Sequence, residues 1–427
     1  MMTPTRRRVA ITGLGAVTPV GNDAPSTWAA LVAGKSGIGP ITTFDASTFP
    51  VRIAGTVKDF AVADALPPEA RHLTRHLSRA AGFGLAATAQ ALADAGIAPD
   101  TYAPEERGVA IGASVGRPEL QELADILYRR HSTDEREVER QAPASVLARD
   151  QTIGVAALAL LGDCQGPMLS VSTACSGSAH ALGEAFRRVQ DGEARMMIAG
   201  GYDALNTYLD VLGFALLGAL TRDYNDDPTH ASRPFDKERS GFVLGEGGVV
   251  AILEDWESAE ARGARILAEL AGYASSMNAY RITDAPPDGG GATLAIANAI
   301  KDAGMQPADI DYIVAHGTST PGNDLCETMA IKNTFGDDAY RLAVSSPKSM
   351  VGHLTSGAGG LNLLAAVYAM REGVVPPTIN YEHPDPKLDL NYVPNEAQAR
   401  PVRAAVVDAF AFGGTNASLV VKRSDER

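Results

Sequence analysis

The chain has 427 residues, of which 45% are hydrophobic and 21% are charged, so it has ample material for a folded core. This length exceeds what one compact core usually reaches, which predicts two core-forming units. With 37 basic and 51 acidic residues the net charge is −14, which argues against a protein that binds nucleic acid by neutralising phosphates. The three cysteines, Cys164, Cys175 and Cys326, lack CxxC spacing, so we expect neither a disulfide framework nor a metal site.

The sequence contains no run of the roughly 18–20 apolar residues that a membrane span requires. The arginines at 6–8 before the apolar residues 9–11 superficially resemble a signal peptide. Thr12 and Gly13 break that run, however, and no A-x-A cleavage site follows. We therefore expect a cytoplasmic protein that does not enter a membrane.

Short apolar runs alternate with segments of helical character along the chain. In the first half, strands are predicted at 8–12, 109–112, 168–172, 196–200 and 247–253, with helices at 27–33, 77–95, 119–140, 155–161 and 176–189. In the second half, helices are predicted at 256–262, 293–303, 325–335 and 357–370, with strands at 264–272, 312–315, 343–345, 404–409 and 418–421. This alternation is typical of parallel sheets covered by helices. The predicted units are 1–255 and 256–427.

Cys175 lies where the predicted strand 168–172 gives way to a helix. Backbone N–H groups and the helix dipole at such a position stabilise a thiolate, so we expect a lowered pKa for the thiol. The small neighbours Ala174, Ser176 and Gly177 leave room for a substrate. Taken alone, a cysteine in this position is more often a buried structural residue.

Two histidines follow predicted strands of the second half. His316 comes directly after the strand 312–315, and His353 follows the strand 343–345 through a loop that contains Lys348. Side chains at the ends of sheet strands meet in a cleft, so we expect both to lie near Cys175. Phe412 is flanked by glycine on a C-terminal loop, which can offer a backbone N–H group and act as a gate.

The sequence resembles the β-ketoacyl-acyl carrier protein synthases, condensing enzymes of the thiolase fold, and most of all their elongating type II class. The resemblance covers nearly the whole chain through VAITGLGAVTPVG at 9–21, VSTAC at 171–175, RPFDKERSGFVLGEG at 233–247, HGTST at 316–320, KSMVGH at 348–353 and FGGTN at 412–416. It implies an α/β thiolase fold with two similar halves in an α-β-α-β-α layered arrangement. It also implies a decarboxylative Claisen condensation of an enzyme-bound acyl thioester with malonyl-acyl carrier protein, in fatty-acid or type II polyketide or polyene biosynthesis.

The resemblance also implies roles for individual residues. Cys175 would accept the acyl group, and the N–H groups of Cys175 and Phe412 would form an oxyanion hole beside Gly413 of the gate. His316 and His353 would hydrogen-bond the malonyl thioester carbonyl, while Lys348 would organise the histidine loop. The remaining matches are Thr318 and Thr320 for the pantetheine arm, and Val115, Thr355 and Phe412 for the acyl pocket. The resemblance implies no metal and no cofactor except the 4′-phosphopantetheine supplied on acyl carrier protein.

Acyl carrier protein is the expected partner. Because the carrier and this chain are both acidic, docking requires a local basic patch. The residues that match carrier-facing positions of the family are Arg71, Arg75, His76, Arg129, Arg130 and Arg222, although each could equally be an ordinary solvated side chain. We also expect a dimer, either a homodimer or a heterodimer with a homologous chain-length-factor-like subunit.

Several residues depart from the family pattern. Asn362 replaces a usual glutamate, and Ala411 replaces a glycine of the gating loop, which is expected to stiffen the gate or shift its resting position because alanine restricts positive φ. Asn278 and Arg281 stand where elongating enzymes usually have aspartate and histidine. Val115 and Thr355 replace the bulkier isoleucine and leucine, which favours a polar, unsaturated or longer acyl chain.

Two alternative functions follow from these departures. The changes at Asn278, Arg281 and Asn362 motivate a diverted enzyme of the same fold that catalyses cyclisation or C–O bond formation. A non-catalytic chain-length partner is the second alternative. It is disfavoured because such subunits generally lack the nucleophilic cysteine, whereas Cys175 is present here.

Overall fold

The structure is a computed structural model that describes residues 6–117, 120–132 and 146–425. The main strands of its first half are β1 (Val9–Val17), β4 (Arg107–Gly112), β5 (Met168–Val171), β6 (Met196–Ala204) and β7 (Glu246–Asp255). Those of the second half are β8 (Ala268–Met277), β9 (Tyr312–Val314), β10 (Ala343–Ser345), β13 (Ala404–Phe410) and β14 (Thr415–Lys422).

The two halves have the same strand order. It runs β5-β4-β6-β7-β1 in the first half and β10-β9-β13-β14-β8 in the second. In each half the second strand of this order is parallel to both of its neighbours, and the last three strands are antiparallel. Antiparallel pairing of residues 9–11 in β1 with residues 268–270 in β8 joins the halves. The boundary between residues 255 and 256 stays a prediction.

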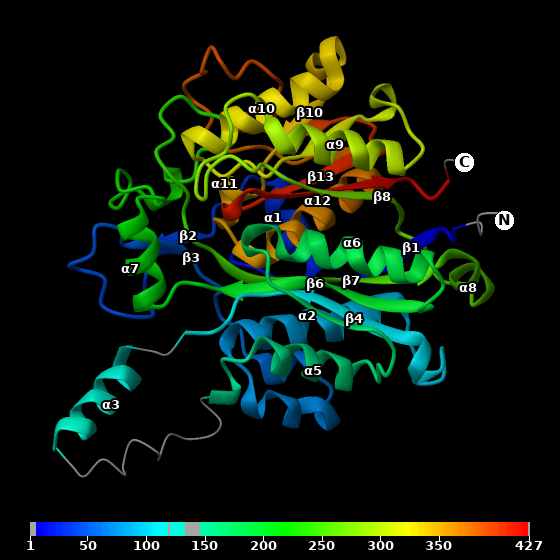
Figure 1. Cartoon of the computed structure of the whole chain (residues 1–427), viewed down its shortest axis with the longest axis horizontal. Helices are drawn as coiled ribbons and strands as arrows, with labels where there is room; N and C mark the ends of the chain where they lie inside the picture. The colour runs from blue at the N-terminus through cyan, green and yellow to red at the C-terminus, as the bar shows by residue number, and fades with distance from the viewer. Residues whose placement is uncertain (1–5, 118–119, 133–145, 426–427) are drawn as a thin grey trace.

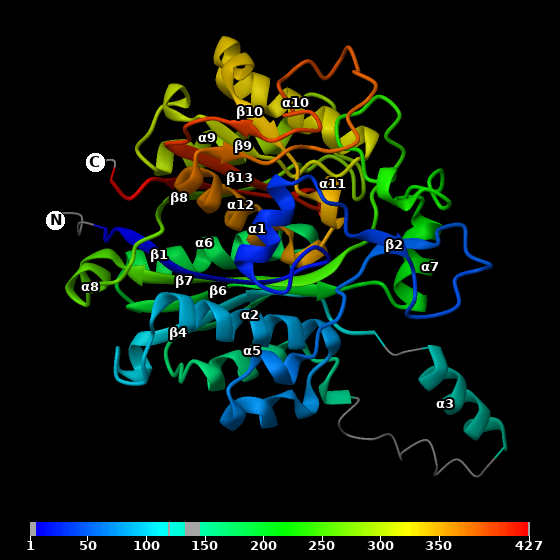
Figure 2. The ribbon, with the colours of Figure 1, turned by 180° about the vertical axis from the view of Figure 1, so that it is seen from behind.

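Helices and strands stack in five layers (Figure 1, and from behind in Figure 2). The outer layer of the first half contains α2 (Arg79–Ala95) and α5 (Gln151–Leu161). The central layer contains α6 (Gly177–Gln190) and α12 (Ala358–Glu372), whose apolar side chains pack in the largest core cluster. The outer layer of the second half contains α9 (Gly290–Asp302) and α10 (Pro321–Phe335).

Local sequence signals explain where the helices begin and end. Ser78 caps α2 by accepting a hydrogen bond from the Ala81 N–H group, and Gly96 ends that helix with a φ of 65°. The further helices are α1 (Ala24–Val32), α3 (Leu120–Ser132), α7 (Tyr208–Leu217), α8 (Trp256–Ala261) and α11 (Lys348–Val351). Short strand pairs are formed by β2 (Ile38–Pro40) with β3 (Ile53–Gly55) and by β11 (Val374–Val375) with β12 (Gln398–Ala399).

The predicted elements differ from the structure at a few places. α3 covers the first part of the predicted helix 119–140, and residues 133–140 lie outside the described chain. β8 begins four residues later than the predicted strand 264–272 and extends to Met277. α7 was not predicted, because its sequence is apolar on nearly all sides, Asp210 excepted, and shows no helical period. Its signals are the capping residue Thr207 and the terminal Gly218, which has a φ of 73°.

None of the helices in the described part of the chain combines the length and apolar character needed to span a membrane.

Candidate active site

Cys175 lies in a single 3₁₀ turn, residues 174–176, between β5 and α6. The preceding Ala174 has a φ of 47°, a strained value for a residue other than glycine, and it holds the tight bend that presents the cysteine. Cys175 is only 8% exposed and lines a cavity of about 390 Å³. His316 and His353 line the same cavity, so the structure brings the three predicted residues together.

The predicted lowering of the Cys175 pKa is wrong for this structure. Burial raises the pKa of the thiol to about 12, because the thiolate is cut off from water. The positive charge of Lys348 and the backbone N–H groups of Cys175 and Phe412 act in the opposite direction and favour the thiolate. These effects favour the thiolate, although they do not outweigh its burial.

The geometry around His353 assigns its protonation state. The Thr355 backbone N–H group donates to Nδ1 of His353 over 3.3 Å, so Nδ1 is an acceptor and the ring proton is on Nε2. This Nε2 is buried and has no hydrogen-bond partner among the described residues. Burial and the charge of Lys348 place the pKa of His353 well below its usual value, which keeps the imidazole neutral. His353 is thus a neutral N–H donor.

His316 lies beside His353, with 5.3 Å between the ring centroids. Burial, Lys348 and His353 lower its pKa well below the usual value, so this imidazole is neutral too. Its loop is held from α10, where Glu327 accepts the N–H groups of His316 and Gly317 at 2.6 and 2.7 Å. Asp324, one helical turn earlier, accepts the N–H group of Thr318 at 3.0 Å.

Lys348 is buried beneath the site, and its Nζ has no hydrogen-bond partner among the described residues. Burial lowers the pKa of Lys348 to about 8, partly offset by the negative charge of Glu327. Burial also raises the pKa of Glu327 to about 7. Lys348 does not line the Cys175 cavity. Its positive charge nevertheless lowers the pKa of Cys175 and of both histidines.

Phe412 separates the Cys175 cavity from a second cavity of about 600 Å³, and it lines both. Thr318 and Thr320 line the first cavity, with their hydroxyl oxygens 2.8 Å apart. Val115 lines the second cavity. Gly413, next to the gate residue, has a φ of 84°, and its N–H group donates to the Ile282 carbonyl at 2.7 Å. The phenylalanine is therefore shared by the cavity that contains Cys175 and a second cavity that contains Val115.

The structure does not bring Thr355 to either of these two cavities. Its hydroxyl donates to the buried carboxylate of Asp203 at 2.6 Å, and Asp203 also accepts from Ser114 at 2.7 Å. Burial raises the pKa of Asp203, and these hydrogen bonds oppose that effect. The hydroxyl that the family's leucine lacks is thus used inside the protein rather than presented to an acyl chain.

The other departures have structural roles. Asn362 donates from Nδ2 to the carbonyls of Ala315 and Asp408, both at 3.0 Å, and so links the ends of β9 and β13. Asn278 lines the cavity and accepts from Asn416 at 2.9 Å, while Arg281 pairs with Asp284 at the rim. Ala411 has a φ of −141°, which is extended backbone, so the expected alanine strain in the gate is absent.

The predicted docking residues lie on separate elements. Arg71, Arg75 and His76 are exposed on a 3₁₀ helix, Pro68–His76, before α2. Arg222 follows α7, where it donates to the Ala215 carbonyl at 2.8 Å. Arg129 and Arg130 belong to α3, but their side chains lie outside the described part of the structure.

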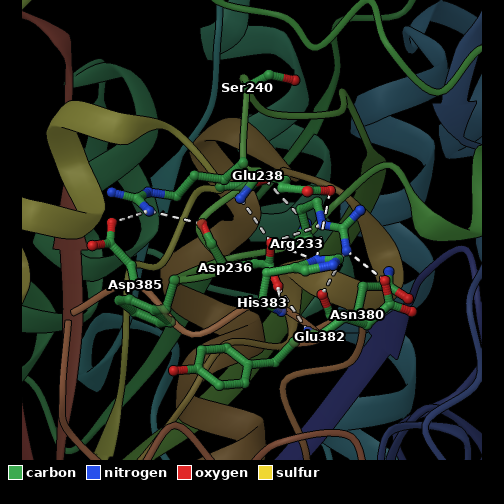
Figure 3. Close-up of polar contacts among 12 residues, drawn as sticks. Arg233, Asp236, Glu238, Ser240, Asn380, Glu382, His383 and Asp385 are labelled. Carbon is green, nitrogen blue, oxygen red and sulfur yellow. Dashed lines mark hydrogen bonds and ion pairs between the residues drawn. The ribbon is translucent and has the colours of Figure 1, made fainter. Parts of the chain in front are cut away.

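A partly buried ionic network lies in the segment that leads to the cavity residues Ser240 and Gly241 (Figure 3). Arg233 pairs with Asp236 at 3.3 Å and with Glu382 at 2.7 Å, while Arg239 pairs with Asp385 at 3.0 Å. The Arg233 N–H group also donates to Ser319 at 3.0 Å. The network thereby fastens the segment 233–241 to the loop that carries His316.

Our sequence reasoning missed Asp203, Asp324 and Glu327. The last two are spaced three residues apart just after the capping residue Thr320, which normally marks a solvated helix face. The described residues contain no group of three or more His, Cys, Asp or Glu side chains placed to hold a metal.

Solved ketosynthases share this fold. A ketosynthase solved with its type II polyketide acyl carrier protein and bound to the hexaketide (AntDE:AntF) superposes with a TM-score of 0.87 and 32% identity, over 98% of this chain and 100% of that one. The ishigamide ketosynthase/chain length factor gives a TM-score of 0.87 and 33% identity, over 98% and 99% of the two chains. The fold is the predicted thiolase fold, and this chain is an acyltransferase of that class.

Sequence comparison gives the family. Residues 6–259 match the β-ketoacyl synthase N-terminal domain, and residues 267–382 match the C-terminal domain. The 3-oxoacyl-[acyl-carrier-protein] synthase 2 of Synechocystis sp. is 46% identical over 98% of both chains, and that of Coxiella burnetii is 43% identical over 98% of this chain and 99% of its own. The chain therefore belongs to the β-ketoacyl synthase family, which confirms the resemblance.

Proposed function

We propose that this chain catalyses the ketosynthase condensation, joining an acyl thioester to a malonyl unit of acyl carrier protein with loss of carbon dioxide. The observation that carries the proposal is the single buried cavity that Cys175, His316 and His353 share. This cavity combines a thiol nucleophile with two neutral N–H donors, which are the groups that acyl transfer and enolate formation require.

In the first half-reaction the sulfur of Cys175 attacks the acyl thioester. The new C–S bond forms as the bond to the carrier thiol breaks, and the cysteine proton passes to that thiol. The two backbone N–H groups that face the sulfur are suited to stabilise the negative oxygen of the tetrahedral intermediate. Burial raises the pKa of the free thiol, whereas Lys348 and the two backbone N–H groups favour the thiolate that attacks.

In the second half-reaction the malonyl carboxylate leaves as carbon dioxide, and the electron pair of the broken C–C bond forms an enolate. N–H donors of His316 and His353 stabilise the enolate oxygen. The enolate carbon attacks the acyl carbonyl, a C–C bond forms as the C–S bond to Cys175 breaks, and the released thiolate takes a proton from solvent. Neutral imidazoles suit this step, because they donate a hydrogen bond without protonating the carbanion.

The test follows both half-reactions separately. Purified enzyme is mixed with octanoyl carrier, and intact mass reports acylation. Malonyl carrier is then added, and carbon dioxide and the β-ketoacyl product are measured. We expect Cys175→Ser to lower condensation roughly a thousandfold or more, because a hydroxyl is a far weaker nucleophile than a thiolate. Cys164→Ser, outside the cavity, is the control. Acylation without carbon dioxide release would instead favour cyclisation or C–O bond formation.

Carrier binding belongs to the same proposal. Thr318 and Thr320 are suited to hold the pantetheine arm, because their hydroxyls line the Cys175 cavity. Arg71, Arg75, His76 and Arg222 are the proposed contacts for the acidic carrier, and the enzyme itself is proposed to act in the cytoplasm. Val115 leaves space in the second cavity for a longer or unsaturated chain.

A dimer completes the proposed assembly. β5 is the terminal strand of the sheet and pairs with β4 on one side, and among the described residues no strand pairs with its other edge, which we propose for a second chain. Leu160 and Met168 are apolar side chains beside this edge that are 70% and 45% exposed. We propose a homodimer as the assembly, and a homologous partner subunit would be distinguished by co-purification of a second chain.

A further inference from the structure

The second cavity contains a charge that a hydrocarbon chain would not need. Val115, Leu205 and Phe412 give it apolar walls, but Arg117 also lines it. Covering a guanidinium with an alkyl chain removes its hydration without replacing the lost hydrogen bonds, which is costly. Arg117 therefore favours a ligand that places a polar group beside its guanidinium in the second cavity.

Asp210 anchors Arg117 from the otherwise apolar helix α7. The Asp210 side chain is 3% exposed, and its Oδ1 lies 3.4 Å from Nε of Arg117. Its other oxygen, Oδ2, accepts the Thr207 hydroxyl at 2.6 Å. Burial raises the pKa of Asp210, and the positive charge of Arg117 partly offsets that effect. The carboxylate thus holds the guanidinium by its Nε side and balances its charge.

The terminal nitrogens of Arg117 remain available to a ligand. Neither makes a hydrogen bond to another residue in the described ranges, and the side chain is 50% exposed. Nη1 lies close to Gly213 of α7, where it would be 3.4 Å from an added Cβ, an ordinary van der Waals distance. Because Asp210 already balances the charge, these donors suit a neutral oxygen better than a carboxylate, which Asp210 would repel.

We propose that Arg117 recognises a neutral oxygen atom, a hydroxyl or carbonyl group, at the distal end of the acyl chain carried by Cys175. This inference rests on the proposed ketosynthase function. It makes Arg117 a specificity-determining residue and Asp210 its positioning residue. The substrate class is then an oxygen-bearing acyl chain rather than a plain alkyl chain.

The test compares chain ends at constant length. kcat/KM for condensation is measured with three eight-carbon carriers, octanoyl, 8-hydroxyoctanoyl and the ω-carboxyl chain 7-carboxyheptanoyl, using the wild type, Arg117→Met and Arg195→Met. Arg195 is the matched control, because it is 51% exposed and also pairs through Nε with a carboxylate, that of Glu106. The ratio of hydroxyl-terminated to methyl-terminated substrate cancels any general damage to the fold.

We expect the wild type to favour the ω-hydroxyl chain over both others, and Arg117→Met to lower the hydroxyl-to-methyl ratio roughly tenfold, as for one lost hydrogen bond to a charged group. Arg195→Met should keep the wild-type ratio. A wild type that prefers octanoyl or the ω-carboxyl chain would overturn the inference, as would an unchanged ratio in Arg117→Met. Absence of condensation with every chain would instead contradict the proposed function.

Discussion

Lys348 influences the site through its charge alone. It is buried behind Cys175, His316 and His353, and its charge lowers the pKa of all three groups. For the cysteine this effect favours the reactive thiolate, and for the histidines it favours the neutral donor. One lysine therefore lowers the pKa of the nucleophile and of both hydrogen-bond donors, which is the direction that the proposed reaction needs.

Replacing this lysine should move the pH profile. In Lys348→Met the histidine pKa values rise, because burial remains but the neighbouring positive charge is gone. The acid limb of kcat/KM should shift to higher pH, and kcat/KM at neutral pH should fall roughly 10- to 100-fold, the range for loss of an interaction with a charged group. Lys332→Met, which removes a lysine paired with Asp389 outside the site, is the control. An unmoved acid limb would contradict this role.

At the scale of the element, α10 positions the histidine loop through buried carboxylates. Glu327 accepts two consecutive backbone N–H groups, and a glutamine would keep one acceptor while turning an NH₂ group towards the other donor. Glu327→Gln should lower the free energy of unfolding by about 1–3 kcal/mol, the cost of one buried unsatisfied donor.

Urea denaturation at fixed protein concentration measures this change. Glu260→Gln, an exposed residue of α8, should leave the midpoint where it is. If both variants unfold at the wild-type midpoint, the carboxylate does not support the loop. A loss of kcat/KM without any loss of stability would assign Glu327 an electrostatic role instead of a supporting one.

The sequence predicted which residues meet in the cavity, because each of them follows a strand of a regular alternating pattern. It could not predict how deeply they are buried, and this is why the expected lowering of the Cys175 pKa failed. Likewise, Asp324 and Glu327 have the spacing of a solvated helix face, and only the packing of α10 shows that they are buried. Thr355 was assigned to the acyl pocket because it matches a pocket position of the family, but its hydroxyl donates to Asp203.

At the scale of the whole molecule, the position of β5 at the end of the sheet predicts a dimer that forms along this strand. Leu160→Glu combined with Met168→Glu places charges beside this edge, which disfavours pairing with a second chain. Size-exclusion chromatography with light scattering should show a dimer for the wild type and mainly monomer for the variant. Leu294→Glu, at a leucine that is 56% exposed on α9, should remain dimeric. A double variant that stays dimeric would place the interface elsewhere.

Net charge makes carrier docking a local effect. A chain with a charge of −14 repels an acidic carrier, so in the proposed docking the basic residues before α2 supply the attraction. Arg75→Glu should raise KM for carrier-bound substrates roughly several-fold with little change in kcat, and added salt should narrow the difference. Arg371→Glu, at the end of α12 remote from the cavity, is the control. Equal KM values in both variants would remove Arg75 from the docking surface.

The position of Phe412 between two chambers has a kinetic consequence. In the proposed mechanism an acyl chain that reaches the second cavity passes Phe412, which lines both cavities, so selection by length and end group would fall in the acylation step, before malonyl is consumed. A mismatched starter would dissociate unreacted, and no extender would be wasted on it. Competing starters should therefore change the product distribution without changing the stoichiometry of carbon dioxide to product.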